Sequence, residues 1–181
     1  KRLPNKPLLK INDKPMIIHV LGKAQEAGIG EVYVATPDKK IKETVEDYGG
    51  KAVLTSENHL TGSDRVYEVF SKFLKSKGDI IINLQSDMPN LDPNSLIKIN
   101  KFMENGDCDI GTLASNLQDD EEIKNESVVK VKLEKKLSDN LFLEAKDFFR
   151  VTNEKKNLNI FHHIGLYAFT ERSLSKFVRF T

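Results

Sequence analysis

The sequence has no tryptophan and a single cysteine, Cys108, among its 181 residues. One cysteine cannot form an internal disulfide, which argues against a small secreted domain held by paired cysteines and favours a reducing cytoplasm. No run of about 18 apolar residues occurs, so the sequence predicts no membrane-spanning helix. The basic start at Lys1 and Arg2 also lacks the apolar stretch of a signal peptide.

An excess of either charge is lacking as well. The 28 lysine and arginine residues nearly cancel the 27 aspartate and glutamate residues, which leaves a net charge of +1. This balance gives no general electrostatic reason to bind nucleic acid or an anionic membrane. A length of 181 residues suits one domain with a sizeable core. We therefore expect one domain, 1–181, with at most a local basic patch for a small anion.

Predicted strands and helices alternate along the first half of the chain. Apolar residues recur at helical spacing after Pro15, and Gly28 is a plausible end of that helix. Strands are predicted at 31–36, 51–54 and 79–84, and helices at 39–48, 64–74 and 94–103. The helix at 64–74 is expected to carry Val66, Val69, Phe70 and Phe73 on one apolar face. This order predicts an α/β fold with a parallel sheet flanked by helices. Ligands of such sheets bind at the carboxyl ends of the strands, near Thr36, Gln85 and Asp87.

The pattern changes from about Asp109 onward. Strand-like runs at 109–115, 127–133, 141–145 and 163–169 follow one another without long helices. They predict a smaller antiparallel extension of the sheet. The charged stretch 119–125 is expected to form a solvated loop or a helical turn.

Two cations lie in a proline-bearing loop at the start of the chain. Proline restrains the backbone, so Arg2 and Lys6 can be held at a fixed spacing. Arginine can grip two phosphate oxygens, and lysine adds a compact charge. The loop therefore suits a triphosphate, although an ordinary solvated basic loop would have the same composition.

Two further segments stand where a predicted strand ends and a helix follows. In 59–65, Gly62 allows an unusual turn and Ser63 can cap the helix, so the segment is either a simple helix start or part of a site. In 85–89, Asp87 follows the strongest predicted strand, where a carboxylate can hold a magnesium ion on a phosphate. A turn aspartate is the alternative.

Adjacent histidines occur in the last predicted strand. Neighbouring strand residues point to opposite faces, so His162 and His163 are not expected to share a metal ion. The absence of a nearby cysteine also argues against a zinc site. His163, Gly165 and Tyr167 share one face, and the other, mostly apolar face is expected to pack on the core. The first face is either a ligand surface or the place of a structural histidine.

In their order and spacing these segments resemble the motifs of sugar-acid cytidylyltransferases. Residues 2–8 resemble R-x-P-G-K-P-L, 59–65 resemble H-x-S-G-T-[DE]-R, and 83–89 resemble N-x-Q-G-D-E-P. Residues 125–131 are similar to N-P-N-x-V-K-V, and 163–167 to H-I-G-[IL]-Y. Residues 14–20 and 34–38 resemble the members specific for 3-deoxy-manno-octulosonate (Kdo). The resemblance covers essentially the whole chain.

The resemblance implies a fold, a reaction and a setting. The fold is a mononucleotide-binding, Rossmann-like domain of the nucleotide-diphospho-sugar transferase type. The reaction is transfer of CMP from CTP to Kdo, which gives CMP-Kdo and pyrophosphate for lipopolysaccharide biosynthesis. The resemblance also implies Mg²⁺ as cofactor, a cytoplasmic location and a possible homodimer.

The resemblance also implies a role for each candidate residue. Asp87 would be a catalytic metal ligand, and Arg2 and Lys6 would neutralise the triphosphate and the departing pyrophosphate. The pocket itself would be lined on the nucleotide side by Gln85 and Arg65, and on the sugar side by His163 and Tyr167.

The sequence departs from the family pattern in several places. The family's first strand and its C-terminal part, in which a second metal-binding aspartate is expected, are not in the sequence, so we expect a chain incomplete at both ends. Ser86 and Met88 replace glycine and glutamate, and no F-S-R-x-x-I-P stretch is visible at 144–150. Another acidic sugar, such as a sialic acid or amino-Kdo, and a non-catalytic scaffold therefore remain open. A dinucleotide-dependent oxidoreductase is disfavoured because no G-x-G-x-x-G follows a strand.

Overall fold

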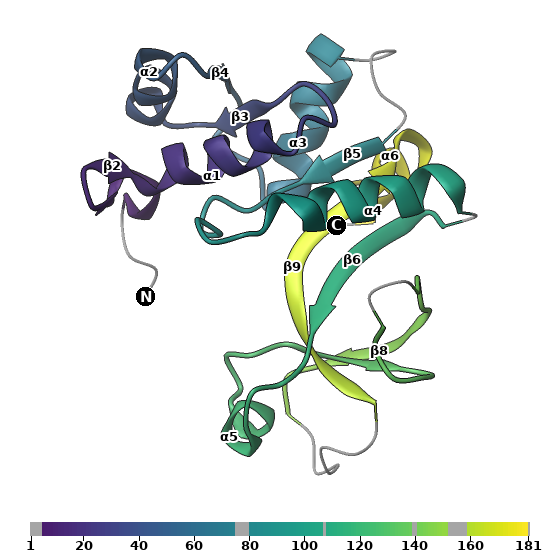
Figure 1. The fold of residues 1–181 in the computed structure, drawn as a ribbon. Coiled ribbons are helices and arrows are strands. Elements are labelled where there is room, and N and C mark those ends of the chain that lie inside the picture. The colour runs from purple at the N-terminus through teal and green to yellow at the C-terminus, as the bar shows by residue number, and fades with distance from the viewer. Residues whose placement is uncertain (1–4, 75–79, 107, 139–140, 152–158, 181) are drawn as a thin grey trace. The chain divides into compact units, whose positions relative to one another are not determined.

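A computed structural model describes residues 5–74, 80–106, 108–138, 141–151 and 159–180 (Figure 1). The chain divides into two compact units. Unit 1 comprises Lys1–Gly111 and Tyr167–Thr181, and unit 2 comprises Thr112–Leu166. No helix within the described residues is both long and apolar enough to cross a membrane.

Unit 1 begins with a short hairpin that leads into its first long helix. A 3-10 turn at Lys6–Leu8 precedes strands β1 (Lys10–Ile11) and β2 (Lys14–Pro15), which pair antiparallel, and α1 (Met16–Glu26) follows directly. Apolar side chains of α1 pack against Val45 of the next helix. The helix ends where Gly28 takes a φ of 63°, a left-handed conformation that costs glycine little because it has no Cβ. The predicted helix and its end are confirmed.

A parallel strand pair with one connecting helix follows, as predicted. Strands β3 (Tyr33–Thr36) and β4 (Lys51–Leu54) pair in parallel along their whole length, and α2 (Lys39–Asp47) connects them. The carboxylate of Asp38 caps α2 by accepting the backbone N–H of Lys40 at 2.7 Å. Gly49, at φ 75°, ends the segment after α2.

The helix predicted at 64–74 changes its winding partway along. It consists of α3 (Gly62–Val69) followed by a π-helical turn at Phe70–Leu74. Val69 and Phe70 are buried as expected, but Phe73 is 56% exposed. A π-helical turn holds more residues than an α-helical turn, so it rotates Phe73 off the face that the 3.6-residue period predicts. The prediction for Phe73 is therefore wrong.

The rest of unit 1 consists of β5 (Ile80–Asn83), α4 (Pro93–Asn105) and α6 (Glu171–Phe177). The alternation of strands and helices predicts a parallel sheet around β5. Among the described residues its partner is the end of β9 (Ile160–Thr170), which pairs with it antiparallel at Tyr167–Thr170. Residues along all of β5 also border a cavity, so no parallel neighbour reaches it within the described ranges.

Unit 2 is mainly antiparallel, as predicted. It contains most of β6 (Ile110–Ser115), α5 (Asp120–Lys124), β7 (Lys130–Leu133), β8 (Ala145–Phe149) and the first part of β9. Strand β7 pairs antiparallel with both β8 and β9. The core of unit 2 includes one cluster of Val131, Leu133 and Phe161 and another of Leu117, Ile123 and Ile160. The charged stretch near 120 does form a helical turn, α5.

The strand predicted at 141–145 is misplaced, because the observed strand β8 covers Ala145–Phe149. Leu143 nevertheless packs against the core of β7 and β9 from outside the strand. An apolar residue that reaches the core from a loop gives the same sequence signal as one in a strand. The hydrophobic pattern therefore located the segment but not the strand within it.

Candidate active site in unit 1

A cavity of about 950 Å³ lies in unit 1. Its wall includes consecutive residues of two strands, 32–36 around β3 and 80–86 around β5. Side chains of a strand alternate between its faces, so a cavity over one face would be lined by every second residue. Lining by consecutive residues means that the cavity runs along an edge of each strand. The other edge of β3 is paired with β4, and that of β5 with β9.

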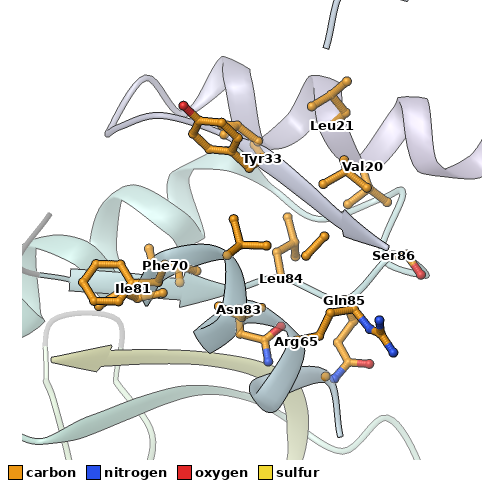
Figure 2. A pocket seen from close by; sticks show the side chains of 18 of the residues that line it. Val20, Leu21, Tyr33, Arg65, Phe70, Ile81, Asn83, Leu84, Gln85 and Ser86 are labelled. Carbon is orange, nitrogen blue, oxygen red and sulfur yellow. The ribbon is translucent and has the colours of Figure 1, made fainter. Parts of the chain in front are cut away.

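The cavity has a polar end. Figure 2 shows Arg65, Gln85 and Ser86 together at the end where β3 terminates, away from Tyr33. Thr36, the last residue of β3, also lines the cavity. The carboxyl ends of β3 and β5 therefore meet, as the sequence analysis expected for Thr36 and Gln85. We call this end the mouth; the residues that define it are Thr36, Arg65, Gln85 and Ser86.

Two predicted site residues from distant parts of the sequence meet beside the mouth. The Lys6 ammonium lies 2.7 Å from the Asp87 carboxylate, and the two side chains are 45% and 42% exposed. Their neighbours Pro7 and Ser86 line the cavity. An exposed ion pair of this kind contributes about 0–1 kcal/mol to stability. Each of the two groups can therefore give up the other and bind a ligand instead, at little cost in stability. Arg2 lies outside the described residues.

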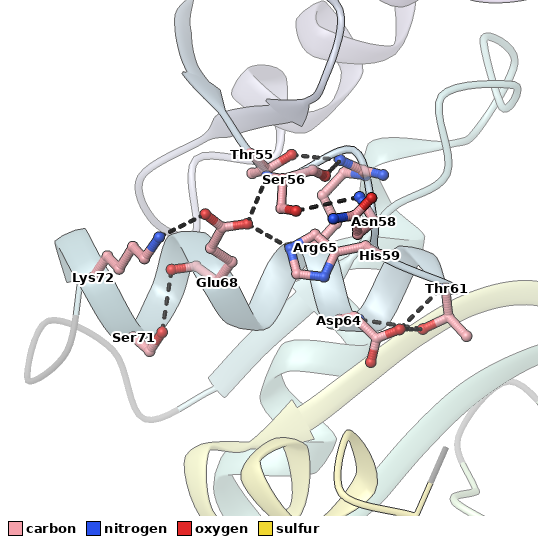
Figure 3. Close-up of polar contacts among 10 residues, drawn as sticks. All are labelled: Thr55, Ser56, Asn58, His59, Thr61, Asp64, Arg65, Glu68, Ser71 and Lys72. Carbon is pink, nitrogen blue, oxygen red and sulfur yellow. Dashed lines mark hydrogen bonds and ion pairs between the residues drawn. The ribbon is translucent and has the colours of Figure 1, made fainter.

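Arg65 is fixed at the mouth by the segment that follows β4. One of its terminal nitrogens, Nη1, donates to the Thr55 hydroxyl at 2.5 Å and to the Ser56 carbonyl at 2.9 Å (Figure 3). The backbone N–H of Thr55 in turn donates to the Thr36 carbonyl at 3.0 Å. The guanidinium is thus tied, through this segment, to the end of β3.

The start of α3 differs from the prediction. Thr61, rather than Ser63, is the N-cap, and Thr61 and Asp64 form a reciprocal capping box. Ser63 is buried and its hydroxyl lies 3.3 Å from the Asn83 side-chain amide, which links α3 to the end of β5. Gly62 is simply the first helical residue and needs no left-handed conformation.

One charged residue near the mouth was missed by the sequence analysis. The Glu68 carboxylate accepts from the Lys72 ammonium at 2.7 Å, from His59 Nε2, and from the backbone N–H of Ser56 at 2.9 Å. These bonds, that of Lys72 foremost, lower the pKa of Glu68 to about 2. The signal available in the sequence was its position three residues after Arg65, on the same helix face.

Unit 2 holds His163, which is 7% exposed. Its Nε2 lies 2.9 Å from the Thr112 hydroxyl, and the Phe148 ring packs edge-on against it at 5.0 Å. Burial, followed by the neighbouring His162, lowers the pKa of His163. His162 is more exposed and lies 2.8 Å from a Glu122 carboxylate oxygen, so the two histidines do point to different surroundings, as predicted.

Tyr167 belongs to unit 1 and lies opposite Asn83 in the pairing of β5 and β9. Burial raises the pKa of the Tyr167 hydroxyl. Leu166, on the strand face expected to pack on the core, is fully buried. Because His163 and Tyr167 lie in different units, their shared ligand surface stays a prediction.

Asp87 is the described residue best suited to a magnesium ion. Mg²⁺ often takes one or two protein carboxylates and completes its shell with substrate phosphates and water. The exposed carboxylate of Asp87 beside a basic side chain fits such a ligand. Across the described ranges no cluster of three histidine, cysteine or acidic residues offers a complete protein-made metal site.

Comparison with known proteins shows the family of the chain. The family model described as "Cytidylyltransferase" matches residues 1–181. The 3-deoxy-manno-octulosonate cytidylyltransferases of Bartonella bacilliformis and Brucella anthropi are 38% and 39% identical to the chain over 98% of its length. The chain spans 72% of the length of each relative. A solved structure of CMP:2-keto-3-deoxy-manno-octonic acid synthetase with CTP is 32% identical, with a TM-score of 0.84 over the whole chain and 73% of the other.

The fold is that of nucleotidyltransferases of the nucleotide-diphospho-sugar type, as the sequence analysis predicted. Within this class the chain belongs to the cytidylyltransferase family, and it is similar to members that are 3-deoxy-manno-octulosonate cytidylyltransferases.

Proposed function

We propose that the protein transfers CMP from CTP to Kdo and releases pyrophosphate, with CMP-Kdo as the product for lipopolysaccharide biosynthesis. The observation that carries the proposal is the contact between Lys6 and Asp87 beside the polar mouth. It joins a cation suited to a phosphate and a carboxylate suited to a metal ion, in a chain related to Kdo cytidylyltransferases. The named neighbour that was solved with CTP gives further support.

The reaction requires that the two substrates be correctly positioned and that the negative charge of the phosphates be neutralised. The anomeric hydroxyl of Kdo attacks the α-phosphorus of CTP, the hydroxyl loses its proton, and the bond to pyrophosphate breaks. Such in-line displacement at phosphorus needs little covalent help from the protein. A bound Mg²⁺ would supply charge neutralisation on the phosphate oxygens.

The candidate site residues divide this work. Lys6 and Arg2 bind the triphosphate and neutralise the departing pyrophosphate. Asp87, now paired with Lys6, would hold the metal ion, which would supply charge neutralisation on the phosphates. Gln85 and Arg65, which line the cavity, contact the nucleotide.

His163 and Tyr167 act on the sugar side in this proposal. Kdo is a carboxylate rich in hydroxyl groups, which suits hydrogen-bonding rings. His163→Ala should raise the Michaelis constant for Kdo and leave that for CTP unchanged. A variant that is unstable, but whose remaining folded fraction is fully active, would assign His163 to structure alone, in keeping with its burial and its contact with Thr112.

The cavity supports one further part of the proposal. An edge of β3 and an edge of β5 border it, and its wall is largely aliphatic (Figure 2). We propose that an apolar strand from polypeptide outside residues 1–181 lies there and completes the sheet of a single nucleotidyltransferase domain. A second metal-binding aspartate, a cytoplasmic location and a homodimer belong to the same proposal.

Pyrophosphate release by the full-length protein tests the proposed function. The assay supplies CTP and Mg²⁺ with Kdo, amino-Kdo or a sialic acid. Release with Kdo, abolished by a chelator and restored by Mg²⁺, is the expected result. Release with a sialic acid but not with Kdo would show that the sugar is wrong.

Met88 favours one rival function, because it stands where the family motif has glutamate. A non-catalytic scaffold would bind CTP without releasing pyrophosphate from any acidic sugar. Equilibrium binding of CTP, measured beside the release assay, separates this outcome from loss of the site altogether.

A further inference from the structure

The peptide groups on either side of Ser56 are bound by the same helix. The Ser56 N–H donates to the Glu68 carboxylate at 2.9 Å, and the Ser56 carbonyl accepts from Arg65 Nη1 at 2.9 Å (Figure 3). Residues three apart in a helix are neighbours on its surface, so Arg65 and Glu68 reach the segment together. Arg65 thus depends for one of its acceptors on a residue that Glu68 holds.

Glu68 is well placed to hold that residue. Its side chain is 13% exposed, and besides Ser56 it accepts from His59 and from Lys72. Hydrogen bonds to an ionised carboxylate are about twice as strong as neutral ones. His59 lies three residues beyond Ser56, so Glu68 fastens the segment at two points.

The second acceptor of Arg65 lies on the same segment. It is the Thr55 hydroxyl, and Thr55 is fixed on its other side by the Thr36 carbonyl. The segment 55–59 is therefore anchored to the end of β3 through Thr55 and to α3 through Glu68. Removal of the carboxylate leaves the segment held by the Thr36 carbonyl and by Arg65 itself, so that Arg65 loses the independent support of its Ser56 acceptor.

We propose that Glu68 is a positioning residue, which holds Arg65 in place at the mouth through the Ser56 peptide. The inference deepens the proposed function, because it rests on Arg65 contacting the nucleotide there. A group fixed before the substrate arrives does not have to be ordered during the reaction, and misplacement of about 1 Å can lower a rate by about a hundredfold. Glu68 itself touches no substrate.

A double-mutant cycle in the full-length protein tests the inference. The variants are Glu68→Ala, Arg65→Ala and the two combined, and the readout is kcat/KM for pyrophosphate release. Glu68→Ala should lower kcat/KM about tenfold to a hundredfold. In the Arg65→Ala background the same change should have little further effect, because residues that act through one another are not additive.

Two further variants separate positioning from folding. Glu68→Gln keeps the size of the side chain and one oxygen for the Ser56 N–H, so it should restore part of the lost kcat/KM. Lys72→Met removes another partner of Glu68 but leaves the segment untouched, and should keep kcat/KM within about twofold, as expected for an exposed pair. If Glu68→Ala does not fold, Glu68→Gln replaces it in the cycle. Additive losses, or normal kcat/KM in the Glu68 variant used, would overturn the inference.

A structural readout keeps the inference separate from the proposed function. If the unaltered protein released no pyrophosphate with any sugar, the function would be wrong, but the side-chain N–H signals of Arg65 could still be followed by NMR. Glu68→Gln and Glu68→Ala should broaden or shift these signals, while Lys72→Met should not. Unchanged Arg65 signals in both Glu68 variants would refute the positioning role.

Discussion

The two units use charged side chains in opposite ways. In unit 1, Lys6 and Asp87 pair at 2.7 Å while each stays more than two fifths exposed. In unit 2, Lys130 is fully buried, and its ammonium donates to the backbone carbonyls of Asn125 and Arg150 at 2.6 Å each. Burial, as the largest cause, lowers the pKa of Lys130.

The difference separates groups that can serve a ligand from groups that serve the fold. A buried ammonium bonded to two carbonyls cannot give up these bonds without becoming an unsatisfied buried charge. An exposed pair loses little when it opens. We therefore expect substitution of Asp87 or Lys6 to impair the reaction and substitution of Lys130 to lower stability.

The largest effect is expected at Asp87. Asp87→Asn removes the charge that would hold the metal ion but keeps the shape of the side chain. Turnover of the full-length protein at saturating Mg²⁺ should fall at least a hundredfold, on the scale of about 2.7 kcal/mol for one lost preorganised interaction. The thermal midpoint should barely change because the pair with Lys6 is exposed.

Asp13→Asn is the matched control for this change, since Asp13 is an exposed aspartate in the turn between β1 and β2. It should alter neither quantity. Near-normal turnover of Asp87→Asn would remove Asp87 from the metal site, and a large loss of stability would undo the contrast between the units.

Lys130 should show the reverse pattern. Lys130→Ala removes a fully buried side chain and its bonds to two backbone carbonyls, of which that of Asn125 keeps the backbone N–H of Val128 as donor, so the expected loss is on the order of 1–3 kcal/mol. Urea unfolding should reveal a lower midpoint, while turnover per folded molecule stays normal. Lys135→Ala, at an exposed lysine just after β7, should leave the midpoint unchanged. Equal midpoints for the two variants would contradict the structural role of Lys130.

Local elements could be predicted from the sequence where local chemistry decides them. Helix α1 and its end at Gly28 follow from apolar spacing and a glycine. The exposure of Phe73 did not follow, because a π-helical turn changes the period on which the prediction rests. Strand β8 was misplaced because Leu143 reaches the core from a loop.

The candidate site could also be predicted in part. The order of the motifs, and the rule that ligands bind at the carboxyl ends of parallel strands, predicted that Gln85 and Thr36 lie at one mouth, where both line the cavity. The partners of Glu68 could not be foreseen, because the fold brings a loop residue, His59, and a backbone N–H, that of Ser56, against one helix face. Such contacts leave no period in the sequence.

A smaller effect than at Asp87 is expected at Lys6. Lys6→Ala removes one of two cations assigned to the triphosphate, so it should raise the Michaelis constant for CTP about tenfold, the equivalent of 1.4 kcal/mol. The constant for Kdo should change much less. Lys10→Ala, at an exposed lysine of β1, serves as control in the same kinetic assay. An effect confined to the Kdo constant would move Lys6 to the sugar side.

The smallest expected effect is a change in how stability depends on pH, and it again distinguishes the units. Burial lowers the pKa of His163 below its usual value of 6.5, so between these two values the unfolded chain binds more protons than the folded one. Stability should therefore decline as the pH falls through 6.5 toward the folded pKa. Glu68 acts at lower pH: its contribution is complete above 4.5 and is lost as the pH falls toward about 2.

Urea midpoints measured between pH 7.5 and pH 3 can separate the two windows. His163→Gln should flatten the decline that begins near pH 6.5 and leave the lower one in place. Glu68→Gln should flatten the decline below pH 4.5 and leave the upper one in place. Each variant is the control for the other, since the two groups lie in different units and titrate over different ranges. If the urea midpoint of His163→Gln still declined fully from pH 6.5, other groups would govern the response of unit 2 to acid. The buried histidine would then give no reason to expect unit 2 to be the more acid-sensitive of the two units.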